Sequence, residues 1–170
     1  ETGNHFLDQG GPQLQNKALP GYEPETLPEG APHATFLAPA VTGLGYFDAV
    51  TDAYLLDIEA EQAQRTDGIH GEVHWNHVPD YVTLRPNAIT KDGKYITRFG
   101  KKASVYDLLQ QTADAYNQDI GITSFYEPYD TYSGDMLSPE IDRQTISDVV
   151  FYLQTLKAPV PRNQDNPDVI

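Results

Sequence analysis

The chain has 170 residues, with 11 basic against 25 acidic side chains and a formal net charge of -14 at neutral pH. A surface of that sign repels phosphate groups, which argues against nucleic acid and anionic membranes as partners. No apolar run approaches the roughly 20 residues that a membrane span needs. The first residues lack the basic and apolar regions of a signal peptide, so we expect the N-terminus of either a cytosolic protein or a mature or trimmed product.

Cysteine is absent from the chain. Its absence excludes disulfides, thiolate nucleophiles, Cys-ligated zinc, iron–sulfur clusters and haem attached through a Cys-x-x-Cys-His motif. We therefore expect this chain to carry no covalently bound haem.

Residues 1–44 are predicted to form an extended segment rich in Pro and Gly. Prolines recur there at positions 12, 20, 24, 28, 32 and 39, which leaves no room for a helix. Short apolar bursts, such as residues 36–38, favour a segment laid over a larger body rather than a disordered tail. Residues 45–170 are predicted to form a single helical unit.

The helical unit is expected to contain about three amphipathic helices with long irregular loops, which gives a mainly α fold class. The first helix begins near Asp52, behind the cap residue Thr51. Its apolar stripe follows three- and four-residue steps through Phe47, Val50, Tyr54 and Ile58. Residues 68–97 are predicted as loop with short extended pieces and a turn at positions 92–93.

The second predicted helix covers residues 104–119. Ser104 and Asp107 form a variant of the capping box at its start. Gly121 is a natural stop because glycine adopts the left-handed conformation that ends many helices.

The third predicted helix begins at Ser138-Pro139 or at Thr145 and ends before Pro159. Its apolar stripe consists of Ile146, Val149, Val150, Leu153 and Leu156. Three helices on such long connections form a thin core. We therefore expect their apolar stripes to pack on a partner that this chain does not contain.

Three imidazoles within eight residues, those of His70, His74 and His77, suggest a site for zinc, copper or nickel. The zinc-protease pattern requires a Glu directly after the first His on a helix, and here Gly71 stands in that place. A metal site and a plain polar loop both remain open at this point.

Asp67 begins an Asp-Gly-Ile sequence that is either a simple turn or the remnant of a calcium loop. Calcium loops place oxygen donors at alternating positions. Arg65 and Thr66 stand where further carboxylates would be expected, which favours the turn over calcium.

Asp119 continues the three- and four-residue steps along the apolar face of the second helix. It also lies near the C-terminal end, where the helix dipole disfavours a negative charge. Desolvation and the dipole would both raise its pKa, which suits a group that donates and accepts a proton near neutrality. The alternative is a solvent-facing residue at a frayed helix end.

Seven sequence phrases in order resemble the di-haem oxidoreductase family, which is related to the bacterial di-haem cytochrome c peroxidases and is often labelled thiol oxidoreductase. They are GGPQLQ (10–15), FLAPAVTGLG (36–45), DGI (67–69), RFGKKA (98–103), QQTA (110–113), DIGIT (119–123) and FYLQTLKAP (151–159). Each phrase alone is weak, but their number and order across nearly the whole chain make chance agreement improbable.

The resemblance implies a larger parent protein, exported to the periplasm or beyond, with two Cys-x-x-Cys-His motifs and two c-type haems. This chain is expected to lie between the two motifs, as part of a cytochrome c-like di-haem architecture. The haem-bearing remainder of the parent is then the expected partner for the apolar stripes. An electron-donor protein and a second copy of the chain are further expected partners.

The resemblance also assigns roles to individual residues. Asp119 falls at the position of the acid beside the peroxide-binding iron, and Phe99 falls at a bridging aromatic where relatives carry Trp. Arg98, Lys102 and Gln111 lie in the matched phrases and are expected near the cofactor. A phenyl ring lacks the indole N–H and is a poorer electron carrier, so hopping through Phe99 is doubtful.

The parent is expected to reduce peroxide or to transfer electrons, whereas the chain alone is expected to be redox-inactive. A different class of function is the alternative: a non-catalytic binding or scaffold module that uses the loop of His70, His74 and His77 for a metal. Calcium binding at Asp67 does not follow from the resemblance, because the acidic positions of the relatives are replaced here.

Overall fold

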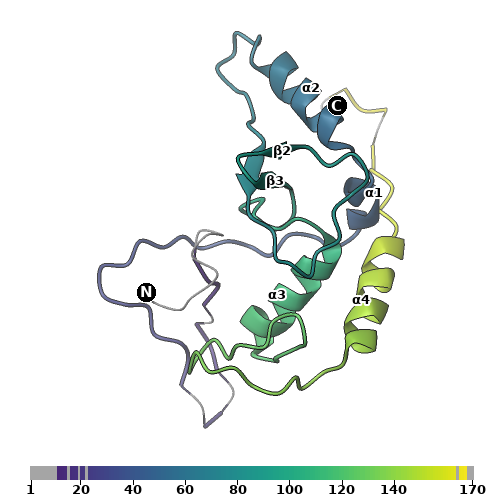
Figure 1. Cartoon of the computed structure of the whole chain (residues 1–170). Coiled ribbons are helices and arrows are strands. Elements are labelled where there is room, and N and C mark those ends of the chain that lie inside the picture. The colour runs from purple at the N-terminus through teal and green to yellow at the C-terminus, as the bar shows by residue number, and fades with distance from the viewer. Residues whose placement is uncertain (1–10, 15, 19, 22, 164, 168–170) are drawn as a thin grey trace.

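The structure is a computed structural model that describes residues 11–167 apart from positions 15, 19, 22 and 164 (Figure 1). Residues 1–10, 15, 19 and 22 of the predicted extended segment, and residues 164 and 168–170 of the predicted helical unit, lie outside the described part. The helices are α1 (Leu44–Asp48), α2 (Asp52–Gln62), α3 (Leu108–Ile120) and α4 (Arg143–Thr155). The strands are β1 (His74–Asn76), β2 (Thr90–Lys91) and β3 (Lys94–Thr97).

The predicted fold class, mainly α with about three helices, is wrong. Only 27% of the structure is helix and 10% is strand, and the helices accompany a small antiparallel sheet with strand order β1-β3-β2. Strands of two to four residues carry no readable hydrophobic alternation. The pairing of β1 with β3 also joins segments that are distant in sequence, and a scan for local patterns does not detect such a pair.

The first predicted helix is divided into α1 and α2. Helix α1 ends at Asp48, and the side chain of Thr51 accepts a hydrogen bond from Tyr54 N at 3.2 Å to cap α2, as predicted. The stripe from Phe47 to Ile58 therefore belongs to two elements rather than one. The two largest side chains of that stripe, Phe47 and Tyr54, are exposed.

Helix α3 begins later than predicted, because Asp107 and not Ser104 is its N-cap. Asp107 Oδ1 accepts a hydrogen bond from Gln110 N at 2.8 Å. The residues before Asp107 cannot join the helix, because Val105 forms a β-bridge with Phe99. The C-terminus agrees with the prediction, because Gly121 adopts the left-handed conformation with φ 68°.

Helix α4 begins at neither of the predicted positions. Asp142 is its N-cap and accepts a hydrogen bond from Thr145 N at 2.8 Å. The helix stops at Thr155, ahead of Pro159 as expected. Ile146 is its one buried residue among those described, whereas Phe151 on the same helix is 67% exposed.

The hairpin of β2 and β3 turns at Asp92 and Gly93, as the sequence indicates. Both residues have positive φ, 53° and 75°, which is the backbone geometry of the tightest antiparallel hairpins. Strand β1 joins the other edge of β3, and Trp75 lies opposite Ile96. Strand β3 leads directly into Arg98 and Phe99, and both of these side chains are buried in the interior of the protein.

The apolar core is small. Its buried cluster contains Phe99, Val105 and Leu108, with Leu44 from α1 and Val150 and Leu153 from α4 packed against it. Figure 1 shows α1 beside the C-terminal end of α4, and α3 alongside the same helix. These contacts bring three helices and the end of β3 together around one side chain, Phe99.

Backbone contacts join the start of α1 to the end of α4. Gly43 N donates a hydrogen bond to Leu156 O at 3.0 Å. A Cβ atom on Gly45 would lie 2.1 Å from Gln154 O, so glycine is required there for the close approach.

The chain leaves much of its surface in water. Its accessible surface is 12241 Å², whereas a compact monomer of 18.9 kDa is expected to expose about 8300 Å². Large apolar side chains contribute to this surface, including Tyr46 at 70%, Phe151 at 67% and Tyr152 at 60% exposure. No helix within the described residues has the length and apolar character needed to cross a membrane.

Candidate functional site

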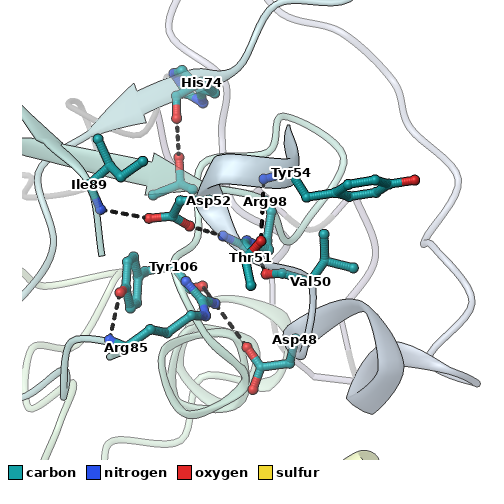
Figure 2. A network of polar contacts seen from close by, with 11 residues as sticks. Asp48, Val50, Thr51, Asp52, Tyr54, His74, Arg85, Ile89, Arg98 and Tyr106 are labelled. Carbon is teal, nitrogen blue, oxygen red and sulfur yellow. Dashed lines mark hydrogen bonds and ion pairs between the residues drawn. The ribbon is translucent and has the colours of Figure 1, made fainter. Parts of the chain in front are cut away.

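A buried ion pair between Arg98 and Asp52 links the end of β3 to the first turn of α2. Figure 2 shows the two side chains turned toward each other. Each side chain is only 2% exposed. Arg98 also donates to Val50 O, and Asp52 Oδ2 accepts from Ile89 N at 2.9 Å. The guanidinium that the resemblance assigns to the cofactor is therefore bound inside the protein by its own carboxylate.

Arg85 forms a second junction beside the first (Figure 2). Its Nη2 donates to Asp48 Oδ1 at 2.8 Å, and its guanidinium carbon lies 4.1 Å from the ring centroid of Tyr106. Tyr106 is fully buried, and its hydroxyl accepts from Arg85 N at 2.8 Å. The Nε and Nη1 atoms of Arg85 are buried without a hydrogen-bond partner in the described structure. No pattern in the sequence indicates these two donors.

Phe99 is a core residue with 2% exposure. Its ring packs edge-on against Phe47, with centroids 5.5 Å apart and planes at 76°. Lys102 lies at the surface, where its Nζ donates to Gly11 O at 3.1 Å. Gln111 is partly buried on α3, and its Oε1 has no hydrogen-bond partner in the described part of the chain. The structure thus does not gather Arg98, Lys102 and Gln111 into one binding surface.

Asp119 is exposed in the last turn of α3. The buried residues of this helix include Asp114, Asn117 and Gln118 instead, so the buried face differs from the one that periodicity predicts. Partial burial nevertheless raises the pKa of the Asp119 carboxyl. An exposed carboxyl with a raised pKa is able to exchange a proton with a group outside the chain.

His70, His74 and His77 are all exposed, and none of them lies on a helix, since His74 is in β1 and the other two are in the segments on either side of it. His74 Nδ1 lies 2.9 Å from Ala103 O. Among the described residues, no three or more His, Cys, Asp or Glu side chains are grouped closely enough to hold a metal ion. The structure does not bring the three imidazoles together.

Asp67 lies in an exposed turn. Its Oδ2 accepts from Arg65 Nη2 at 2.6 Å, and its Oδ1 accepts from Ile69 N at 3.0 Å. Both carboxylate oxygens are engaged locally, which agrees with the simple turn rather than a calcium loop.

A buried acidic group on the other side of α3 was missed by the sequence analysis. Asp114 and Glu127 are each 4% exposed, and Tyr81 donates from its hydroxyl to Glu127 Oε1 at 2.8 Å. Burial, followed by the charges of Glu127 and Asp107, raises the pKa of Asp114 well above its usual range. Burial and the charge of Glu127 raise the pKa of Tyr81 as well. Polar residues at buried helix positions carry no hydrophobic signal, so periodicity could not reveal this group.

The family comparison identifies the class of protein. The chain belongs to the family described as "Di-haem oxidoreductase, putative peroxidase", which matches residues 34–170. This confirms the resemblance seen in the sequence phrases. Searches of curated proteins and of solved structures found no match.

The family name implies a haem. Covalent attachment does not fit, because there is no cysteine to form a thioether. Nε and Nη1 of Arg85 lack hydrogen-bond partners in the described part of the chain, but both atoms are buried, so they offer no contact to a haem propionate outside the chain.

Proposed function

We propose that this chain is the segment between the two haem-attachment motifs of an exported di-haem oxidoreductase that reduces peroxide, and that the chain alone has no redox activity. The family match over residues 34–170, in a chain without cysteine, carries the proposal. The large accessible surface supports it, because a segment of a bigger protein loses the neighbours that would cover its apolar side chains.

Within the parent, the haems would supply the redox chemistry of peroxide reduction, and this chain would supply positioned side chains. Asp119 would hold and release a proton at its carboxyl, for which its exposure and raised pKa are suitable. Phe99 would stabilise the fold rather than conduct electrons, because it lies inside the apolar core.

The role of Asp119 is tested in the intact parent. Asp119→Asn is expected to lower peroxidase turnover by about 100-fold or more, since general acid–base catalysis contributes on that scale. Asp57→Asn, a change at an exposed carboxylate on α2, is the matched control and should keep full turnover. Equal turnover in the two variants would remove Asp119 from the mechanism.

The placement between two haem motifs is tested by sequencing the gene on both sides of the codons for residues 1–170. Two Cys-x-x-Cys-His motifs, one on each side, together with an export signal upstream, are the expected result. Their absence would instead favour a binding or scaffold module without redox chemistry. Pull-down of an electron-donor protein by the intact parent, and not by the isolated chain, would identify the remaining partner.

A further inference from the structure

Besides Gln111 Oε1, three buried oxygen atoms on α3 lack any hydrogen-bond partner in the described structure. They are both carboxylate oxygens of Asp114 and the Oδ1 atom of Asn117. The two residues are 4% and 1% exposed and stand one helical turn apart, so their side chains lie on the same side of the helix. Burying acceptors without partners costs free energy, and burying an unpaired carboxylate costs far more.

The orientation of Asn117 is fixed by its other amide atom. Its Nδ2 donates to Tyr129 O at 2.7 Å, which leaves Oδ1 as the unpartnered atom. Figure 1 shows the segment after α3 folding back along the C-terminal end of that helix. Glu127 lies in this segment, is buried, and is close enough for its charge to affect the pKa of Asp114.

A neighbouring donor does not account for these atoms. Gln110 Nε2, one turn before Asp114, is also buried without a partner. The orientation of this side-chain amide is fixed by its oxygen atom, because Gln110 Oε1 accepts a hydrogen bond from Tyr106 N at 2.9 Å. One amide group has two hydrogens at most, so it cannot satisfy the carboxylate of Asp114 and the distant oxygen of Asn117 together.

We propose that Asp114, Asn117 and Glu127 bind a divalent cation with oxygen ligands, of the calcium type. Two carboxylates would neutralise the charge of the ion, and the amide oxygen would add a neutral ligand. The set contains no nitrogen or sulfur ligand, which disfavours zinc and copper. Tyr81, which donates to Glu127, would orient that carboxylate from behind. The site is independent of the proposed haem function and is separate from the turn at Asp67.

Calcium binding is measured by titration calorimetry on the 170-residue chain after treatment with a chelator. One calcium ion per chain is expected, with a melting temperature that rises with calcium concentration. Asp114→Asn should weaken binding by at least about 10-fold, the scale on which changes around a metal site act. Glu127→Gln serves as a second variant if Asp114→Asn does not fold, and it should weaken binding comparably.

Two control variants locate the ion. Asp148→Asn, at an exposed position on α4, and Asp67→Asn, in the turn, should both bind calcium as the unchanged chain does. Loss of binding in Asp67→Asn alone would place the ion in the turn and overturn the proposal. Absence of binding in the unchanged chain would also overturn it.

Discussion

Asp52 and Arg98 form an ion pair in which both side chains are 98% removed from water, and it joins α2 to the end of β3 across 46 residues of sequence. The pair stabilises the fold only while both partners are present, because a single buried charge has neither water nor a counter-ion. It also fixes the direction of the chain just before the core residue Phe99. The junction between α2 and the end of β3 is therefore held by an ion pair rather than by apolar packing.

Removal of one partner should destabilise the chain strongly. Asp52→Ala is expected to lower the free energy of unfolding by about 3–5 kcal/mol, because Arg98 would remain buried and unpaired. Asp67→Ala, which breaks the exposed pair with Arg65, should change it by less than about 1 kcal/mol. Urea unfolding followed by circular dichroism measures both. Similar losses in the two variants would contradict the assigned role of the buried pair.

Phe99→Ala should create a cavity at the centre of the core. A loss of about 3–5 kcal/mol in the free energy of unfolding is expected for a fully buried phenylalanine. Phe151→Ala, at a side chain that is 67% exposed on α4, is the matched control and should cost about 0.5 kcal/mol or less. If thermal unfolding ranked the two variants equally, Phe99 would not be the centre of the core.

Gly45→Ala should push α1 away from α4. The new Cβ would lie 2.1 Å from Gln154 O and 2.8 Å from Gln154 C, and a backbone neighbour cannot move aside as a flexible side chain can. A loss of about 1–3 kcal/mol is expected for such overpacking. Gly71→Ala meets only the side-chain oxygen of Gln62, at 3.2 Å, and should be nearly neutral. Unfolding midpoints in urea that agree between the variants would disprove the close approach.

Acid should weaken the cap of α4. Hydrogen bonds from Thr145 hold the pKa of Asp142 below the ordinary value of 3.8. The carboxylate therefore contributes its full stability above that value, and the contribution is lost as the pH falls through the lower pKa of the folded state. Asp142→Asn keeps a capping oxygen that does not titrate. Between about pH 6 and pH 2, unfolding experiments should show the unchanged chain losing stability relative to the variant. A constant difference would refute the titration of the cap.

Local chemistry in the sequence was enough to predict several boundaries of the fold. Thr51 caps α2, Gly121 ends α3, and the turn between β2 and β3 lies at Asp92 and Gly93, because each of these depends on a residue and its immediate neighbours. The start of α3 was misplaced, since the bridge between Val105 and Phe99 removes the preceding residues from the helix. That bridge is a tertiary contact.

The candidate site was less predictable than the fold boundaries. Arg98 stands in a family phrase, yet its partner Asp52 is far away in sequence and only the folded chain brings them together. The apolar steps that led to Asp119 assume that buried helix positions are hydrophobic. Helix α3 instead buries Asp114 and Asn117, so the rule failed where polar groups are enclosed. Buried polar residues of this kind are found from coordinates and not from periodicity.

The hydrogen bond between Gly43 and Leu156 has a mechanical consequence. The hydrogen bond holds the residue before α1 next to the residue after α4, so the chain enters and leaves the region from α1 to α4 at neighbouring points. Whatever lies before residue 43 and whatever follows residue 156 start out from a common origin.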